Sequence, residues 1–242
     1  MKKQNKPILL ITGSSRGIGA SIARLSKKYG YEVILHGRTK SKPLLNIAKE
    51  LESNYLFFDV TKEEQIKSGL NKLSHINALV NSAGINISKS FEELTSSDWN
   101  KTFSNNVIGL SNVIKYSLPK LRNSETITRI VNIASIKGTY SAVGRVAYAS
   151  SKASVINLTC GLAKEFAPDI LVNAVSPGFT QTEMTSNTWS QRIEKQVESI
   201  LLKRIASPNE IAELVLFLCS DKCTYITGQN INVDGGFSIK NI

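Results

Sequence analysis

The 242-residue chain has 41% hydrophobic and 20% charged residues, a composition typical of a globular domain with one sizeable core. No apolar run approaches the roughly 20 residues that a membrane-spanning helix needs. The net charge is +11, but apart from small clusters at residues 2–6 and 38–42 the basic residues are scattered along the chain. We therefore expect solvated helix faces rather than a nucleic-acid or membrane surface.

The N-terminus and the cysteine content indicate a reducing compartment. The first three residues are basic and an apolar stretch follows, but Gly13 ends that stretch early and no small-residue cleavage site comes after it. We therefore expect no signal peptide and a cytoplasmic protein. The cysteines are Cys160, Cys219 and Cys223, and the histidines are His36 and His75. Because the histidines are far from the cysteines in sequence, we expect core-packing thiols and no metal site.

Apolar runs of strand length alternate with helical stretches along the whole chain. Strands are expected at residues 8–12, 32–36, 55–58, 78–81, 129–134, 171–175 and 230–233. Helices are expected at about residues 17–29, 44–51, 62–73, 98–118, 146–166, 183–201 (interrupted) and 208–219. The repeated units predict a single α/β domain over residues 1–242, a doubly wound parallel sheet of about seven strands with helices on both faces.

The first predicted strand runs directly into a glycine-rich turn. Residues 13–19 read Gly-Ser-Ser-Arg-Gly-Ile-Gly, and the stretch that follows has the pattern of a helix. Glycines allow positive φ and close approach of the backbone, and the free N–H groups of a helix N-terminus attract an anion. An ordinary strand-to-helix turn also favours glycine and serine, but the G-x-x-x-G-x-G spacing favours a phosphate-binding loop.

Polar residues fall at the carboxyl ends of the predicted strands, where ligands bind in sheets of this kind. These residues are Thr12, Arg38, Asp59, Asn81, Ser135 and Ser176. The least regular stretch, residues 178–206, is polar and weakly periodic and follows the sixth predicted strand. We interpret it as a lid over the ligand site.

Tyr148 and Lys152 are spaced to lie on one face of a predicted helix, one turn apart. A nearby ammonium favours the ionised form of a phenol and lowers its pKa, so the spacing indicates a tyrosine that can exchange a proton near neutral pH. Such pairs also occur on ordinary surface helices. The pair therefore gains its meaning from the other motifs in the chain.

Together these motifs resemble the short-chain dehydrogenase/reductase family over almost the whole chain. Residues 12–19 match the cofactor motif T-G-x-x-x-G-x-G, and residues 81–84 match N-N-A-G with Ser82 in place of the second asparagine. Residues 176–178 followed by Thr182 resemble the segment that closes over the nicotinamide. The resemblance implies a Rossmann-type fold and hydride transfer between a nicotinamide cofactor and a carbonyl carbon.

The resemblance also implies a catalytic tetrad of Asn106, Ser135, Tyr148 and Lys152. Tyr148 would exchange a proton with the substrate oxygen, Lys152 would lower the pKa of Tyr148 and bind the nicotinamide ribose, and Ser135 would donate a hydrogen bond to the developing oxyanion. Asn106 would anchor a water that links Lys152 to solvent. The family motif places this asparagine just before an apolar residue, which favours Asn106 over Asn105. Singly, the serine could be a strand-end turn residue and the asparagine a polar residue inside a helix.

The cofactor is expected to be NADP(H). An NAD-selective site usually has an acidic residue at the end of the second strand, but residues 35–40 contain none. Arg38 and Arg16 can each bind the 2′-phosphate of NADP. The alternative is that both arginines are simply exposed surface residues. Asp59 resembles the aspartate that bonds the adenine ring, or it could cap the next helix. The cofactor residues implied by the resemblance are Gly13, Ser15, Arg16, Gly17, Ile18, Gly19, Arg38, Asp59, Val60, Asn81, Ala83, Gly84, Tyr148, Lys152, Pro177, Gly178, Thr180 and Thr182.

Among subfamilies, the chain is most similar to 3-oxoacyl-acyl carrier protein reductases, through residues 14–16, 36–38, 177–184 and 226–236. The last of these stretches resembles a tetramer-forming C-terminus, so a homotetramer is expected. Such reductases often present basic residues to an acidic carrier protein, but residues 166–170 carry Asp169 instead. Arg122, Arg129 or Arg145 could substitute, and Arg145 lies about one helical turn before Tyr148.

Two other functions stay open. The first is reduction of a free small carbonyl, a sugar or a secondary alcohol, which would use the same tetrad and differ in the pocket formed by residues 138–145 and the lid. The second is a non-enzymatic NADP-binding sensor, against which the intact tetrad argues. A nucleic-acid-binding role rests on the net charge alone.

Overall fold

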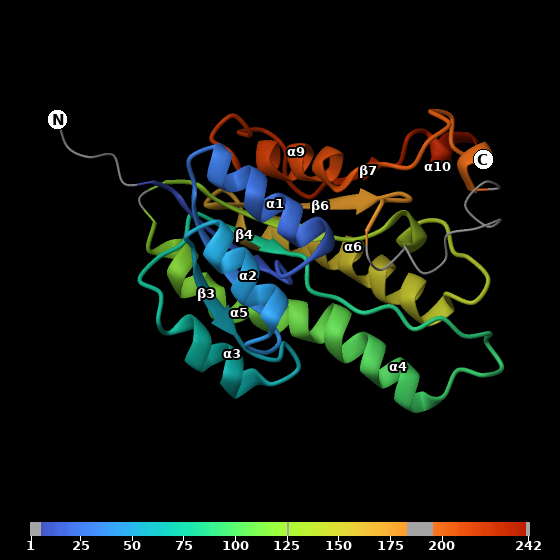
Figure 1. Ribbon diagram of the computed structural model, residues 1–242, viewed down its shortest axis with the longest axis horizontal. Helices are drawn as coiled ribbons and strands as arrows, with labels where there is room; N and C mark the ends of the chain where they lie inside the picture. Colours follow the sequence, from blue (N-terminus) through green and yellow to red (C-terminus); the bar gives the residue numbers. More distant parts are fainter. Residues whose placement is uncertain (1–5, 125, 183–195, 241–242) are drawn as a thin grey trace.

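The computed structural model describes residues 6–124, 126–182 and 196–240. Its centre is a seven-stranded, fully parallel sheet in the order β3-β2-β1-β4-β5-β6-β7 (Figure 1). The strands are β1 (Ile8–Thr12), β2 (Glu32–Gly37), β3 (Asn54–Phe57), β4 (Ala78–Asn81), β5 (Thr128–Ile133), β6 (Ile170–Pro177) and β7 (Asn230–Val233). The predicted doubly wound α/β fold of seven strands is confirmed.

Helices cover both faces of the sheet, which explains why the strands are almost continuously apolar. One face carries α1 (Gly17–Lys28), α2 (Lys42–Glu50) and α9 (Pro208–Cys219). The other carries α3 (Glu63–Leu70), α5 (Leu110–Arg122) and α6 (Val146–Phe166). Successive residues of β1 point to opposite sides, so that Leu9 packs in the first layer and Leu10 in the second. None of the helices that the structure describes is long and apolar enough to cross a membrane.

The helix predicted over residues 98–118 is in fact three segments. They are α4 (Ser96–Phe103), a π-helical turn η1 (Ser104–Gly109) and α5. Hydrophobic periodicity does not reveal one extra residue inside a turn, and such π-turns occur frequently at functional sites. Gly109 explains how the turn is accommodated, because a Cβ there would lie 2.9 Å from the Val60 carbonyl oxygen.

Two short helices were not predicted from the sequence. A 3-10 turn, η2 (Ile136–Gly138), follows β5, and α10 (Phe237–Lys240) follows β7. The Asp234 carboxylate stabilises the start of α10, because it accepts hydrogen bonds from the backbone N–H groups of Gly236 and Ser238 at 3.0 Å. Of the interrupted helix expected at 183–201, residues 183–195 lie outside the described residues.

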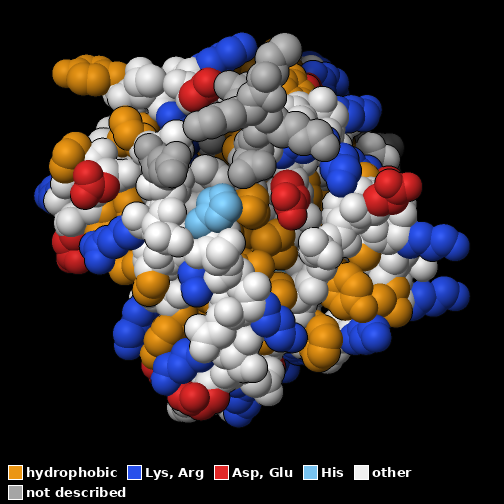
Figure 2. Space-filling view, turned by 90° about the vertical axis from the view of Figure 1, so that its left-hand side faces the viewer, with side chains coloured by type: hydrophobic (Ala, Val, Ile, Leu, Met, Phe, Trp, Pro, Cys, Tyr) orange, Lys and Arg blue, Asp and Glu red, His pale blue; other side chains and the backbone are white. Residues whose placement is uncertain are grey.

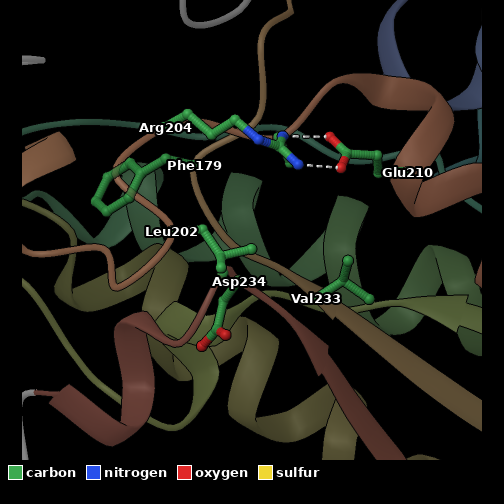
Figure 3. A pocket seen from close by; sticks show the side chains of 8 residues that line it. Phe179, Leu202, Arg204, Glu210, Val233 and Asp234 are labelled. Carbon is green, nitrogen blue, oxygen red and sulfur yellow. Dashed lines mark hydrogen bonds and ion pairs between the residues drawn. The ribbon is translucent and has the colours of Figure 1, made fainter.

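The two described ends of the predicted lid, residues 178–182 and 196–206, are held together beside the sheet. Thr180 and Ala206 form a parallel bridge, in which Ala206 N–H donates to the Phe179 carbonyl and Gln181 N–H donates to the Ala206 carbonyl, both at 2.9 Å. A small pocket of about 90 Å³ lies next to this bridge, and the ion pair between Arg204 and Glu210 runs along one side of it (Figure 3). The two described ends of the predicted lid are therefore joined just beyond the carboxyl end of β6.

Candidate active site

The turn after β1 has the shape of a phosphate cradle. Gly13 and Gly17 have φ values of +66° and +58°, and a Cβ at Gly19 would lie 2.4 Å from the Gly13 carbonyl oxygen. Helix α1 then begins after Arg16 without any capping hydrogen bond from a side chain. The N–H groups of its first turn are therefore open to an anion, and the loop fits the pyrophosphate of a dinucleotide.

Thr12 ties this loop to the turn after β4. Its hydroxyl oxygen accepts hydrogen bonds from the N–H groups of Ser82 and Ala83 at 3.1 and 3.2 Å. A Cβ at Gly13 would lie 2.8 Å from the Ala83 nitrogen, so the two turns touch through their backbones. Because Ser82 contributes its backbone here, its departure from the family motif leaves this contact intact.

His36 is a site residue that the sequence reasoning missed. It is 1% exposed, its Nδ1 accepts a hydrogen bond from Gly13 N–H at 3.2 Å, and its Nε2 lies 3.0 Å from the Phe58 carbonyl oxygen. Nε2 therefore carries the proton, and burial lowers the pKa of His36 to about 4. The sequence feature that could have indicated a role for His36 is that it is a single polar residue at the end of an apolar strand. His36 joins the glycine loop to the segment that precedes Asp59.

The predicted adenosine-side residues lie in the glycine loop and just after β2 and β3. Arg16 and Arg38 are exposed, and within the described ranges neither takes part in an ion pair. Asp59 accepts hydrogen bonds from the N–H and the hydroxyl of Thr61, at 2.9 and 2.8 Å. Helix α3 begins after Lys62 without a side-chain cap, so neither Asp59 nor Thr61 caps it. The capping alternative for Asp59 is wrong.

Tyr148 and Lys152 lie one turn apart on α6, as the spacing predicted. The buried Lys152 ammonium donates a hydrogen bond to the Ile133 carbonyl at 2.7 Å and lies 5.8 Å from the centre of the Tyr148 ring. Burial lowers the pKa of Lys152 to about 8. The Lys152 side chain is therefore buried and still mostly protonated at neutral pH.

The direction expected for the pKa of Tyr148 is wrong in this structure. Burial raises the pKa of Tyr148, while a hydrogen bond with Ser135 and the charge of Arg145 act in the opposite direction. The Lys152 ammonium donates to the Ile133 carbonyl and lies 5.8 Å from the centre of the Tyr148 ring, and the lowering of the Tyr148 pKa by Lys152 stays a prediction. Ser135, just after β5, also accepts a hydrogen bond from Lys137 N–H at 3.2 Å, which fixes the serine to η2.

Asn106 lies in the π-turn and is buried against the other site residues. Its Oδ1 accepts from Ile85 N–H at 2.8 Å, and its Nδ2 donates to the Ile85 carbonyl at 2.9 Å and to Ser151 Oγ at 3.0 Å. Asn105 is instead hydrogen-bonded to the Lys101 carbonyl on the surface. The structure thus brings Asn106 into the site rather than Asn105, and the water link stays a prediction.

Gly84 lets the backbone pass between two members of the predicted tetrad. A Cβ there would lie 3.2 Å from Asn106 Oδ1 and 3.7 Å from Lys152 Nζ. On the other side of the site, the Thr182 methyl group would lie 3.7 Å from a Cβ at Gly17, and Gly178 packs against Asp234. Residues 178–182, the first described end of the predicted lid (here called the lid entrance), and the glycine loop are therefore neighbours, as the predicted cofactor set requires.

A larger hollow of about 330 Å³ lies at the opposite edge of the sheet. Its wall includes Ile8, Glu32 and Asn54, the first residues of three strands, and Figure 2 shows that face. It is therefore separate from the carboxyl-end site. Among the residues described, no group of three potential metal ligands comes together.

Comparison with known proteins identifies the family. A family model described as "Enoyl-(Acyl carrier protein) reductase" matches residues 13–238. The 3-oxoacyl-[acyl-carrier-protein] reductase of Aquifex aeolicus is 39% identical over 98% of both chains, and the acetoacetyl-CoA reductase of Shinella zoogloeoides is 34% identical over 95% of this chain and 97% of its own.

Solved structures agree with these relatives. A short-chain dehydrogenase/reductase from Brucella melitensis superposes with a TM-score of 0.89 at 32% identity, and F189W actinorhodin polyketide ketoreductase with NADPH superposes with a TM-score of 0.89 at 30% identity. Each covers 98% of this chain and 99% of its own. The chain belongs to the short-chain dehydrogenase/reductase family. It is an oxidoreductase acting on CH–OH or C=O groups, and it binds a nicotinamide cofactor.

Proposed function

We propose that this protein reduces the 3-oxo group of acyl thioesters carried on acyl carrier protein, with NADPH as the reductant. The observation that carries the proposal is the gathering of Tyr148, Lys152 and Ser135 beside the glycine loop, at the carboxyl ends of β1 and β5. Relatives of 35–39% identity named 3-oxoacyl-[acyl-carrier-protein] reductase support the substrate class. A homotetramer and residues 178–206 as a lid belong to the same proposal.

NADPH supplies the hydride, and the residues of the chain manage the proton. Ser135 donates a hydrogen bond to the ketone oxygen, where negative charge develops, and Tyr148 gives that oxygen its proton. The positive charge of Lys152, one turn away, stabilises the phenolate that Tyr148 leaves. Asn106 holds the Ile85 backbone and thereby the wall of the site, and a water beside it returns the proton.

The preference for NADPH over NADH rests on Arg16 and Arg38. Both guanidinium groups are exposed at the ends of the glycine loop and β2, and residues 35–40 contain no carboxylate that would repel a 2′-phosphate. A guanidinium binds a phosphate through two parallel hydrogen bonds, which a ribose hydroxyl cannot match.

One observation favours a second candidate, a reductase of free small carbonyls. Arg129, a suggested docking residue, is 8% exposed and donates to the carbonyls of Ile127 and Cys223, so it cannot meet a carrier protein. Arg122 ends α5, near the residues that precede β4, away from the carboxyl-end site. Of the three suggested arginines, only Arg145 lies near Tyr148.

The test is NADPH oxidation with acetoacetyl groups offered on a carrier protein and on free pantetheine. We expect turnover of both, with kcat/KM at least about tenfold higher for the carrier-bound form, and far weaker use of NADH. Equal kcat/KM values would favour the free-carbonyl candidate. No turnover of either thioester, with tight NADPH binding, would overturn the proposed substrate class.

A further inference from the structure

Two cations, Lys137 and Arg145, lie at the catalytic residues, and neither has a carboxylate partner among the described residues. Most of the other described arginines form hydrogen bonds within the protein or are assigned to the cofactor. Arg24 and Arg204, for example, each bind a glutamate through two hydrogen bonds. The proposed reaction with its tetrad assigns no role to Lys137 or Arg145.

Lys137 is fixed to the same turn as Ser135. Its backbone N–H donates to Ser135 Oγ at 3.2 Å, and its ammonium lies 5.3 Å from the ring centres of both Phe179 and Phe237. These two rings pack edge to face, with their centres 5.3 Å apart. Phe179 belongs to the lid entrance and Phe237 to α10, so the ammonium lies where the serine turn meets both. Ring faces hold a cation in place without neutralising it.

Arg145 immediately precedes α6, three residues before Tyr148. It has no hydrogen bond from its side chain to any other described residue, and it is only partly exposed. Its charge lowers the pKa of Tyr148 and also that of Lys137, which burial lowers as well. Arg145 thus lies within one helical turn of Tyr148.

Lys137 is fixed to the turn of Ser135, and Arg145 lies three residues before Tyr148, so a cation without a carboxylate partner among the described residues lies next to each of these two groups. A partly buried cation of this kind is stabilised when an anion binds to it. We propose that Lys137 and Arg145 bind an anionic group on the carbonyl substrate, a phosphate or a carboxylate, and so select charged over neutral substrates. The inference rests on the proposed carbonyl reduction at Tyr148. A backbone contact fixes the loop that carries Arg145, because the carbonyl of the neighbouring Gly144 accepts a hydrogen bond from Lys89 N–H at 3.2 Å.

The anion has two chemical sources, which separate probes distinguish. A phosphate would come from the pantetheine arm, and a carboxylate from the far end of the acyl chain. The probes are acetoacetyl-pantetheine, which is neutral, acetoacetyl-4′-phosphopantetheine, and the pantetheine thioester of 3-oxoglutarate. Each is assayed with the wild type and with the variants Lys137→Met and Arg145→Gln. Lys164→Met, in the last turn of α6, is the matched control.

We expect one of the anionic probes to have a KM at least about tenfold below that of the neutral probe, the effect of one charge-assisted contact. Each variant should raise the KM of that probe about fivefold to tenfold relative to the neutral probe, and leave the KM for NADPH unchanged. Any effect of Arg145 on the proton transfer from Tyr148 acts on both probes. It therefore cancels in the ratio of the KM for the anionic probe to the KM for the neutral probe. The Lys164→Met variant should keep the wild-type ratio.

Equal KM values for neutral and anionic probes in the wild type, or an equal change for both in the variants, would overturn the inference. The same ratio is measured with ethyl acetoacetate against the monoethyl ester of 3-oxoglutarate. If the thioesters are not reduced but these esters are, the carrier-protein substrate fails, while the ester ratio still decides the anion receptor.

Discussion

At the scale of single residues, Tyr148 is the group on which the proposed chemistry depends. It lies on α6 beside Ser135, and burial raises its pKa, so it is protonated at neutral pH and is suited to act as an acid. We expect Tyr148→Phe to lower kcat by about 100-fold or more, the usual contribution of a positioned proton donor, with NADPH affinity unchanged. Steady-state rates and NADPH titration measure this. Tyr225→Phe, at a fully exposed tyrosine, is the control and should keep near-normal kcat.

At the same scale, the proposed preference for NADPH is tested at Arg38. Replacing it with leucine removes a charge-assisted contact to a 2′-phosphate, so we expect kcat/KM for NADPH to fall about tenfold to 100-fold while that for NADH stays the same. Lys40→Met, two residues further on, should change neither value. An equal fall in kcat/KM with NADPH and with NADH would show that Arg38 stabilises the loop and does not bind the 2′-phosphate.

At the scale of elements, η1 and the turn at Gly84 hold the site wall in place. A Cβ at Gly84 would press on Asn106 Oδ1 at 3.2 Å, so Gly84→Ala should displace the amide that binds Ile85. We expect kcat to fall about tenfold, as is common when catalytic groups shift slightly. Gly161→Ala on α6 meets nothing within 4 Å and should raise the free energy of unfolding by up to about 1 kcal/mol. If Gly84→Ala keeps full activity, the wall does not position the site.

His36 makes the glycine loop sensitive to acid. Its pKa is about 4 in the folded protein and near 6.5 when unfolded, so the unfolded state binds more protons between these values and stability falls as pH falls. From pH 7 to pH 5 we expect a loss of about 2 kcal/mol from this group. Urea unfolding at the two pH values measures it. His75→Gln should show the same loss and His36→Asn a smaller one, and an unchanged loss in His36→Asn would contradict the assignment.

At the scale of the whole molecule, the sequence predicted what periodicity and glycine spacing encode. The seven strands, the helix that carries Tyr148 and Lys152, and the glycine loop follow from such patterns. The π-turn at Asn106 does not follow from such patterns, because it depends on the contact between Gly109 and Val60, which are 49 residues apart in sequence. The partners of His36 and Lys152 are the backbone carbonyls of Phe58, just after β3, and of Ile133 in β5, and no local pattern encodes those contacts.

The most direct test of carbonyl reduction at this site follows the hydride itself. NADPH deuterated at C4 of the nicotinamide, on the face that is transferred, is incubated with an acetoacetyl thioester, and the 3-hydroxy product is analysed by mass spectrometry and NMR. We expect the wild type to place deuterium on C3 of the product, and Tyr148→Phe to yield almost no product. NADPH oxidation without deuterium at C3, or equal labelling by the variant, would contradict the proposed reaction and the role of Tyr148.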